Sequence, residues 1–82
     1  MRRNDLDICA DILKIAQSGA KKTQLVYKAN LNFKIVKKYI KRLGDTELLT
    51  SKNGYFITTD KGNKFLQNYS EFVVPFSNNM IK

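Results

Sequence analysis

The stretch 32-NFKIVKKYIKRLG-44 decides the fold, because its residues separate into two faces when they are placed on a helix. Successive residues of a helix are turned by about 100°. On that wheel the apolar side chains share one side: Ile35, Val36, Tyr39, Ile40 and Leu43. The cations share the other: Lys34, Lys37, Lys38, Lys41 and Arg42. The stretch therefore predicts a helix that packs with one face and presents an unbroken basic stripe on the other.

The distribution of charge along the chain sets this stripe apart from an ordinary solvated surface. The 82 residues include 15 Lys or Arg and 7 Asp or Glu, which gives a net charge of +8. Residues 14–44 hold nine of these cations and no acid, so this segment carries +9 and the remainder −1. Soluble surfaces usually mix the two signs, which lowers self-repulsion. The concentration of positive charge therefore predicts a polyanionic partner.

Length and composition exclude several other classes of protein. Eighty-two residues predict one domain, and no apolar run is long enough to span a membrane. The segment 1-MRRNDLD-7 leads into an amphipathic pattern and does not resemble a secretory signal. Cys9 is the single cysteine and histidine is absent, which removes internal disulfides, cysteine-rich metal sites and the commonest general base. We expect a buried Cys9, a cytoplasmic location, no enzymatic activity and no cofactor.

The segment before the basic stretch predicts two further helices. Asn4 is expected to cap a helix that runs to about Ser18, with two aspartates in its first turn. Apolar residues cover most of its circumference, so this helix must be covered on more than one side. Gly19 is expected to end it, and Thr23 is expected to cap a second, short helix.

Two turn signals then predict the overall arrangement. Residues 30–32, NLN, form a tight turn in which Asn32 caps the basic helix, and two helices joined in this way outline a helix-turn-helix. In 48-LLTSKNGYFITT-59, two β-prone stretches are joined by Asn53-Gly54, the strongest short signal for a hairpin. The predicted class is mainly α with a small β-hairpin, a winged helix-turn-helix domain over residues 1–62.

Residues 63–82 are predicted to form an extended C-terminal helix with a second apolar stripe, which Pro75 kinks or ends. A helix that reached Met80 would be roughly 30 Å long, more than so small a domain can cover. We therefore predict that its outer half, together with the apolar face of the first helix, pairs with a second copy of the chain. The predicted dimer interface comprises Leu6, Cys9, Leu13, Phe65, Tyr69, Phe72, Val73, Phe76 and Met80.

The run 21-KKTQLVYKANLNFKIVKKYIKRLGDTELL-49, followed by 54-GYFITTDKGNKFL-66, resembles the small archaeal winged-helix DNA-binding proteins. The segments KKT, YKANLN and TTDKG carry the resemblance, which extends over about residues 3 to 70. The most similar group is chromatin-associated and dimerises through an antiparallel pair of C-terminal helices. The resemblance implies a homodimer with two basic surfaces that bind duplex DNA. The shorter last helix and Pro75 depart from the family's long arm.

These observations make binding of double-stranded DNA the leading prediction, with the basic helix in the major groove. Lysine acts on phosphate as a point charge, and only Arg42 in this helix has the planar fork that reads guanine. The start of the second helix is expected to meet a phosphate through side chains and free backbone N–H groups, and the hairpin tip to reach a neighbouring groove. The predicted DNA-binding residues are Lys21, Lys22, Thr23, Asn32, Lys34, Lys37, Lys38, Lys41, Arg42, Lys52 and Asn53.

One alternative remains open at this stage, since a fold does not fix a function. The domain would then be an adaptor whose aromatic C-terminal helix binds a different protein. Mass in solution separates the two hypotheses, because a stable homodimer occupies that stripe. Under the DNA-binding hypothesis the partners are double-stranded DNA and a second copy of the chain, in association with the nucleoid and with neither a membrane nor a small-molecule substrate. A regulatory and an architectural role are equally compatible with the sequence.

Overall fold

The computed structural model describes residues 4–69 of the chain. Its elements are, in order, α1 (Asp5–Ile15), the 3-10 turn η1 (Ala16–Ser18), α2 (Lys22–Lys28), α3 (Phe33–Asp45), β1 (Leu49–Lys52) and β2 (Tyr55–Thr58). Residues 60–69 form a further helix, called the last helix below. The predicted class, mainly α with one antiparallel hairpin, is confirmed. Among residues 4–69, no helix has the length and apolar character needed to cross a membrane.

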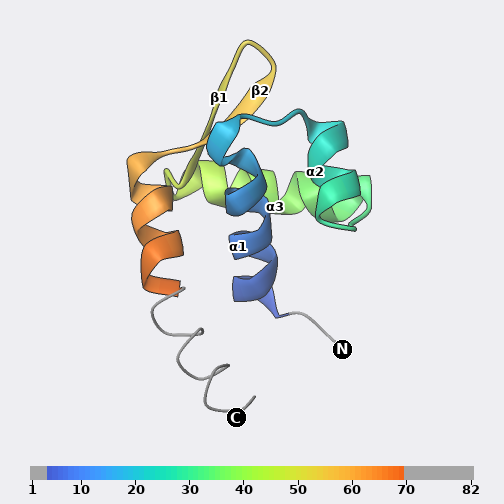
Figure 1. Ribbon diagram of the computed structural model, residues 1–82. Coiled ribbons are helices and arrows are strands. Elements are labelled where there is room, and N and C mark those ends of the chain that lie inside the picture. Colours follow the sequence, from blue (N-terminus) through green and yellow to red (C-terminus); the bar gives the residue numbers. More distant parts are fainter. Residues whose placement is uncertain (1–3, 70–82) are drawn as a thin grey trace.

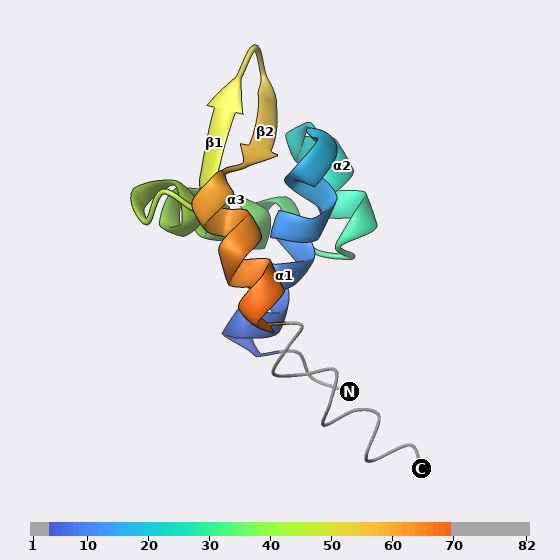
Figure 2. The same ribbon diagram turned by 60° about the vertical axis from the view of Figure 1, so that its left-hand side comes forward.

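The elements surround α1, which lies at the centre of the domain. In Figure 1, α3 crosses behind α1, α2 lies against the N-terminal half of α3, and the hairpin β1–β2 projects from the body as a wing. The last helix, drawn in orange, runs beside α1 in this view, and Figure 2 shows it passing in front of α1. The wing and the lower end of the last helix thus point away from each other.

The core explains the central position of α1. Its members come from every helix and from β1: Cys9, Ala10, Ile12, Leu13, Ala16, Ala20, Leu25, Val36, Tyr39, Leu43, Leu49 and Leu66. Burying a Leu, Ile or Val side chain contributes roughly 1.5–3 kcal/mol. Because so many of these residues belong to α1, the expectation that this helix is covered on more than one side is confirmed.

The same packing corrects part of the predicted dimer interface. Leu13 has no exposed surface and Cys9 is 9% exposed, because both side chains are covered by the chain's own core. Neither residue is available to a second copy while the domain is folded. Leu6, which is 54% exposed, is the member of the α1 set that remains on the surface.

The expected caps on α1 and α3 are confirmed. Asn4 Oδ1 accepts a hydrogen bond from the Asp7 N–H at 2.8 Å, and Asp7 Oδ2 accepts one from the Asn4 N–H at 3.4 Å. This reciprocal pair is a capping box. Asn32 Oδ1 accepts from the Ile35 N–H at 2.8 Å and begins α3 in the same way. Gly19 follows η1 with a φ of 91° and ends the first helical segment, as predicted.

The predicted cap of α2 is wrong. The helix begins at Lys22, so Thr23 lies inside its first turn and not before it. The Lys21 N–H instead donates to the side-chain oxygen of Gln24 at 2.8 Å, which satisfies one N-terminal donor from within the helix.

The wing has the predicted turn and a firmly held base. Asn53 and Gly54 both have positive φ, 53° and 83°, as a two-residue hairpin turn requires. At the base, Ala20 forms a bridge to Phe56, with N···O distances of 3.0 and 2.7 Å. The buried Thr58 hydroxyl donates to the Leu13 carbonyl at 2.6 Å. The segment before α2 therefore pairs with β2 through its backbone and supports the base of the hairpin.

The last helix begins with a close approach to the wing. The Thr59 hydroxyl accepts from the Gly62 N–H at 3.0 Å and donates to the Glu47 carbonyl at 2.7 Å. Gly62 lies in the first turn, where its role is spatial: a Cβ there would lie 2.3 Å from the Leu48 carbonyl oxygen. The predicted domain boundary after residue 62 falls inside this helix. Pro75 and the predicted interface residues Phe72, Val73, Phe76 and Met80 lie outside the described residues.

A hydrogen bond from Tyr69 joins the last helix to the start of α1. The Tyr69 hydroxyl donates to Asp7 Oδ1 at the start of α1. This bond, together with partial burial, raises the pKa of Tyr69 from 10.0 to about 12. A raised pKa means that the folded state favours the protonated phenol. The resulting stabilisation is fully present below pH 10 and is lost as the pH rises towards 12.

Tyr69→Phe tests this link. At neutral pH we expect the variant to lose about 1 kcal/mol of unfolding free energy, the usual contribution of one such hydrogen bond. The difference between parent and variant should narrow as the pH rises through the interval from 10.0 to about 12. Urea denaturation at fixed pH values measures it. If the difference in unfolding free energy between parent and variant stays constant up to about pH 12, the link between Tyr69 and Asp7 is contradicted.

Candidate nucleic-acid interface

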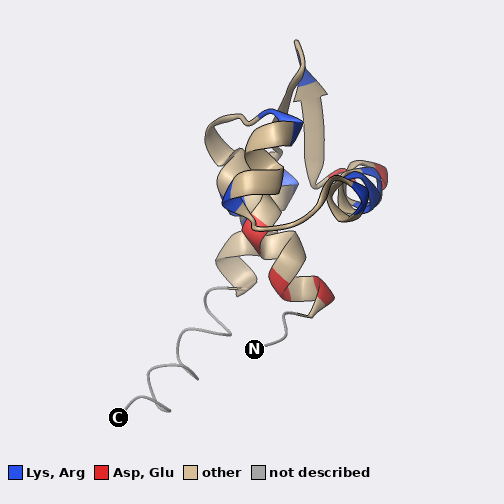
Figure 3. Cartoon of the chain, turned by 90° about the vertical axis from the view of Figure 1, so that its right-hand side faces the viewer, with Lys and Arg blue, Asp and Glu red and all other residues tan. Residues whose placement is uncertain are grey.

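The cations of α3 form one exposed surface. We call Lys34, Lys37, Lys38, Lys41 and Arg42 the cation face, and all five are exposed. The opposite side of the helix is covered, since Val36, Tyr39 and Leu43 are at most 3% exposed. Figure 3 views α3 along its axis and shows its Lys and Arg positions turned away from the rest of the domain. The two faces predicted from the sequence are therefore present in the fold.

One edge of the cation face is occupied by an acid from α1. Asp5 Oδ2 lies 3.5 Å from the Arg42 guanidinium, and Asp5 Oδ1 accepts a hydrogen bond from the Tyr39 hydroxyl. The Arg42 guanidinium also lies over the Tyr39 ring, 5.6 Å from its centroid. The Tyr39 hydrogen bond, with help from Arg42, lowers the pKa of Asp5, and the same bond raises the pKa of Tyr39. Arg42 is thus paired with an acid from a distant segment, a contact that the sequence pattern of α3 does not indicate.

The start of α2 lies beside the wing. Lys21 Nζ is 5.5 Å from the centroid of the Tyr55 ring on β2. Lys21, Lys22 and Thr23 are all exposed. The expectation of a free backbone N–H does not hold for Lys21, because its N–H is bonded to Gln24. Only the side chain of Lys21 is left to meet an anion.

The remaining predicted residues lie at two other places. Lys52, the last residue of β1, and Asn53 in the turn are exposed at the wing tip. Asn32 is exposed at the start of α3, but its side-chain oxygen is used by the cap. The exposed positive and polar side chains therefore lie in three places: the cation face, the start of α2 and the wing tip.

Exposed aromatic side chains occur on these same elements, and the sequence reasoning did not single them out. Tyr27 on α2 is 82% exposed, Phe33 at the start of α3 is 53% exposed, and Tyr55 on the wing is 42% exposed. For Phe33 a signal was available, because its position on the helical wheel lies outside the arc of the buried residues. For Tyr27 and Tyr55 the pattern carried no comparable indication.

A narrow groove separates the C-terminal half of α3 from β1. Its volume is about 140 Å³, and its lining residues are Ile40, Gly44, Leu49, Thr50, Ser51 and Phe56. The wing therefore covers one flank of α3 only along this half of the helix.

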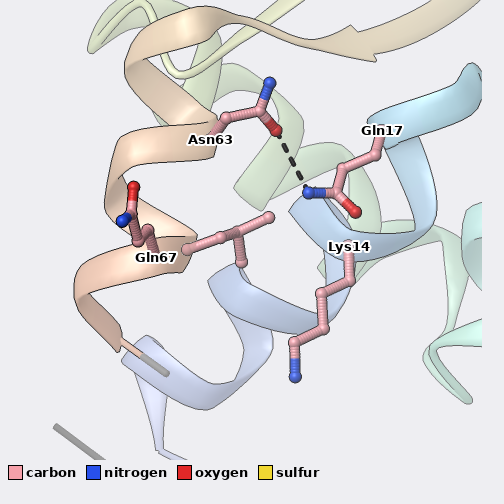
Figure 4. A pocket seen from close by; sticks show the side chains of 5 residues that line it. Lys14, Gln17, Asn63 and Gln67 are labelled. Atoms are coloured by element: carbon pink, nitrogen blue, oxygen red, sulfur yellow. Dashed lines mark hydrogen bonds between the residues drawn. The ribbon is translucent and has the colours of Figure 1, made fainter. Parts of the chain in front are cut away.

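A larger hollow of about 390 Å³ lies between the end of α1 and the last helix. It is lined by Lys14, Gln17, Asn63, Leu66 and Gln67. Figure 4 shows the Gln17 amide donating across it to Asn63 Oδ1, at 3.1 Å. Lys14 Nζ lies 5.8 Å from the centroid of the Tyr69 ring. These contacts join α1 to the last helix. Within residues 4–69, no group of three or more His, Cys, Asp or Glu side chains is placed to hold a metal ion.

Comparisons with known proteins match this architecture. A family model described as winged helix-turn-helix matches residues 2–74. The uncharacterized protein MJ0290 of Methanocaldococcus jannaschii is 33% identical over 72 residues, which cover 87% of this chain and 34% of that protein. The chain thus spans about a third of that relative's length.

A solved structure shares the fold. The crystal structure of Sso10a-2, a DNA-binding protein from Sulfolobus solfataricus, matches with a TM-score of 0.82 at 24% identity. The match covers 95% of this chain and 86% of that one.

Proposed function

The chain belongs to the winged helix-turn-helix family, and from that membership we propose that it binds double-stranded DNA through the cation face of α3. The resemblance to small archaeal winged-helix proteins is confirmed, because the family match is of this class and both relatives come from archaea. The solved relative is described as DNA-binding, which supports the proposal.

The observation that carries the proposal is the exposed cation face opposite a buried one. In the proposed complex α3 lies in the major groove, whose width admits one helix. The lysines neutralise phosphates, and Lys21 and Lys52 meet the backbone on either side. Because Arg42 is paired with Asp5, its fork is less available to read guanine. The proposed binding therefore favours affinity over strict sequence reading, which suits an architectural role better than a gene-specific one.

A salt series tests the proposal. The dissociation constant for random-sequence duplexes, measured by fluorescence anisotropy, should rise with salt concentration. The logarithm of the association constant should fall linearly with log salt by about 0.9 for each phosphate contact. Contacts from the four lysines of the cation face, together with Lys21 and Lys52, would give a slope of roughly −5 per chain. Binding that is insensitive to salt, or confined to single strands, would refute the proposal.

We also propose that the protein is a homodimer joined by its C-terminal segment. The stacked pair Phe65 and Tyr69 is half-buried on the last helix, and the apolar spacing continues in sequence to Phe72 and Phe76. Soluble monomers avoid leaving an apolar stripe of this length in water. A two-fold pair would also present two cation faces to one duplex.

Sedimentation measures the oligomeric state. The parent protein should have twice the chain mass of 9.5 kDa at micromolar concentration. Phe72→Glu with Phe76→Glu should give a folded monomer that binds duplexes more weakly. A monomeric parent would overturn the dimer and favour the adaptor alternative, in which that stripe binds another protein.

A further inference from the structure

Phe33 belongs neither to the cation face of α3 nor to the buried face of that helix. It is the first residue of the helix, directly after the capping Asn32. Its side chain is 53% exposed, although a large apolar residue at a helix start could pack inward. Exposure of this size on the most basic element of the domain calls for a ligand-based explanation.

The wheel of α3 places Phe33 beside the cation face. Phe33, Lys37, Ile40 and Gly44 are spaced by four, three and four residues, so they lie along one strip of the helix. Towards its C-terminal end, half-buried Ile40 and exposed Gly44 line the narrow groove beside β1. The N-terminal half, formed by Phe33 and Lys37, is exposed. This half therefore places an apolar ring one helical turn from a lysine of the cation face.

At the opposite edge of the cation face, Arg42 is paired with an acid from α1. Asp5 lies 3.5 Å from Arg42 there, which lowers the net positive charge at that edge relative to the strip that holds Phe33. Recognition helices of helix-turn-helix proteins contact base edges with their N-terminal residues. The Asn32 oxygen is used by the cap, and the exposed side chains of that first turn are Phe33 and Lys34.

We propose that Phe33 is a specificity-determining residue that contacts the 5-methyl groups of thymine in the major groove. Apolar contact with this methyl group is one of the readouts that the major groove offers, and phenylalanine is among the side chains that make it. The contact gives an otherwise sequence-tolerant, lysine-based interface a preference for thymine-containing duplexes. This inference rests on the proposed DNA binding and adds a chemical selectivity to it.

Replacement of thymine by uracil removes only the methyl group and tests the contact directly. Two duplexes of one mixed sequence, one with thymine and one with uracil throughout, are titrated at the same salt concentration. The parent protein should bind the thymine duplex more tightly, by roughly fourfold for each methyl group buried. In a second pair of duplexes, 5-methylcytosine in place of cytosine should strengthen binding by a similar factor, because its methyl group occupies the same place in the groove.

Phe33→Ala should bind all these duplexes alike, with the salt slope of the parent. Tyr27→Ala is the matched control, because it removes another exposed aromatic side chain, from α2, and should keep the preference. Thermal melting checks that both variants fold. Equal affinity of the parent for thymine and uracil duplexes, or a preference that survives in Phe33→Ala, overturns the role of Phe33. Failure of the parent to bind any duplex with a salt slope instead refutes the proposed function itself.

Discussion

Replacing Lys37 and Lys41 together by alanine is expected to weaken duplex binding about tenfold to hundredfold at 0.1 M salt. Both side chains lie on the cation face and are exposed, whereas Val36 and Leu43 on the other side of α3 are buried. The substitutions therefore remove charge without disturbing the core, and alanine is a good helix former. The slope of log affinity against log salt should fall in magnitude by about two per chain. Anisotropy titrations across a salt series measure both quantities.

The matched control is Lys14→Ala with Lys64→Ala. It changes the net charge by the same amount, from exposed positions on α1 and the last helix. We expect its salt slope to equal that of the parent. If both double variants lose the same affinity, the attraction comes from the net charge of the whole protein, and the assignment to α3 is wrong.

Gly62→Ala should destabilise the fold more than any surface substitution. The added Cβ would lie 2.3 Å from the Leu48 carbonyl oxygen and 2.6 Å from Thr58 Cγ2. A backbone atom cannot move aside as the end of a side chain can, so the base of the wing and the last helix must separate. Overpacking of this kind costs about 2–3 kcal/mol, which for a domain of this size lowers the melting temperature by roughly 10–20 °C.

Gly44→Ala provides the comparison for Gly62→Ala. Gly44 lies inside α3, and a Cβ there would meet nothing within 4 Å. The gain in helix propensity should stabilise the protein by about 0.5–1 kcal/mol. Thermal melting of both variants separates the steric effect of the added Cβ from its effect on the conformational entropy of the backbone. Equal melting temperatures for the two would show that the last helix does not approach Leu48 in solution.

The features predicted correctly from the sequence depend on neighbouring residues. The two faces of α3 follow from its own periodicity, and the caps by Asn4 and Asn32 follow from side chains that bond three residues along the chain. The Asn53-Gly54 turn requires only two positive φ angles. The predicted cap of α2 was wrong for an equally local reason, because the helix begins one residue before Thr23 and Gln24 bonds back to the Lys21 N–H.

The features that escaped prediction depend on contacts between distant segments. The Asp5–Arg42 pair exists because α1 crosses α3, and no periodicity within either helix indicates that crossing. Leu13 was assigned to an interface because α1 seemed to have more apolar surface than one domain needs, but packing from several elements covers it completely. The residues around Gly62 in the sequence give no reason for a glycine there, and the approach of the Leu48 carbonyl explains it.

Contacts with the rest of the domain hold the wing at its root, whereas its tip projects into solvent. Its root is held by the Ala20–Phe56 bridge and the Thr58 hydroxyl, whereas Lys52 and Asn53 are exposed at the tip. A flexible lysine that is immobilised on binding gives up about 0.5–1.5 kcal/mol of conformational freedom. The paired strands at the tip have no such support, and two strands alone form a marginally stable pair, so holding Lys52 in place adds a backbone cost. A lysine on α3 approaches a phosphate from a rigid helix, so an identical charge contributes less to affinity from Lys52 than from Lys37.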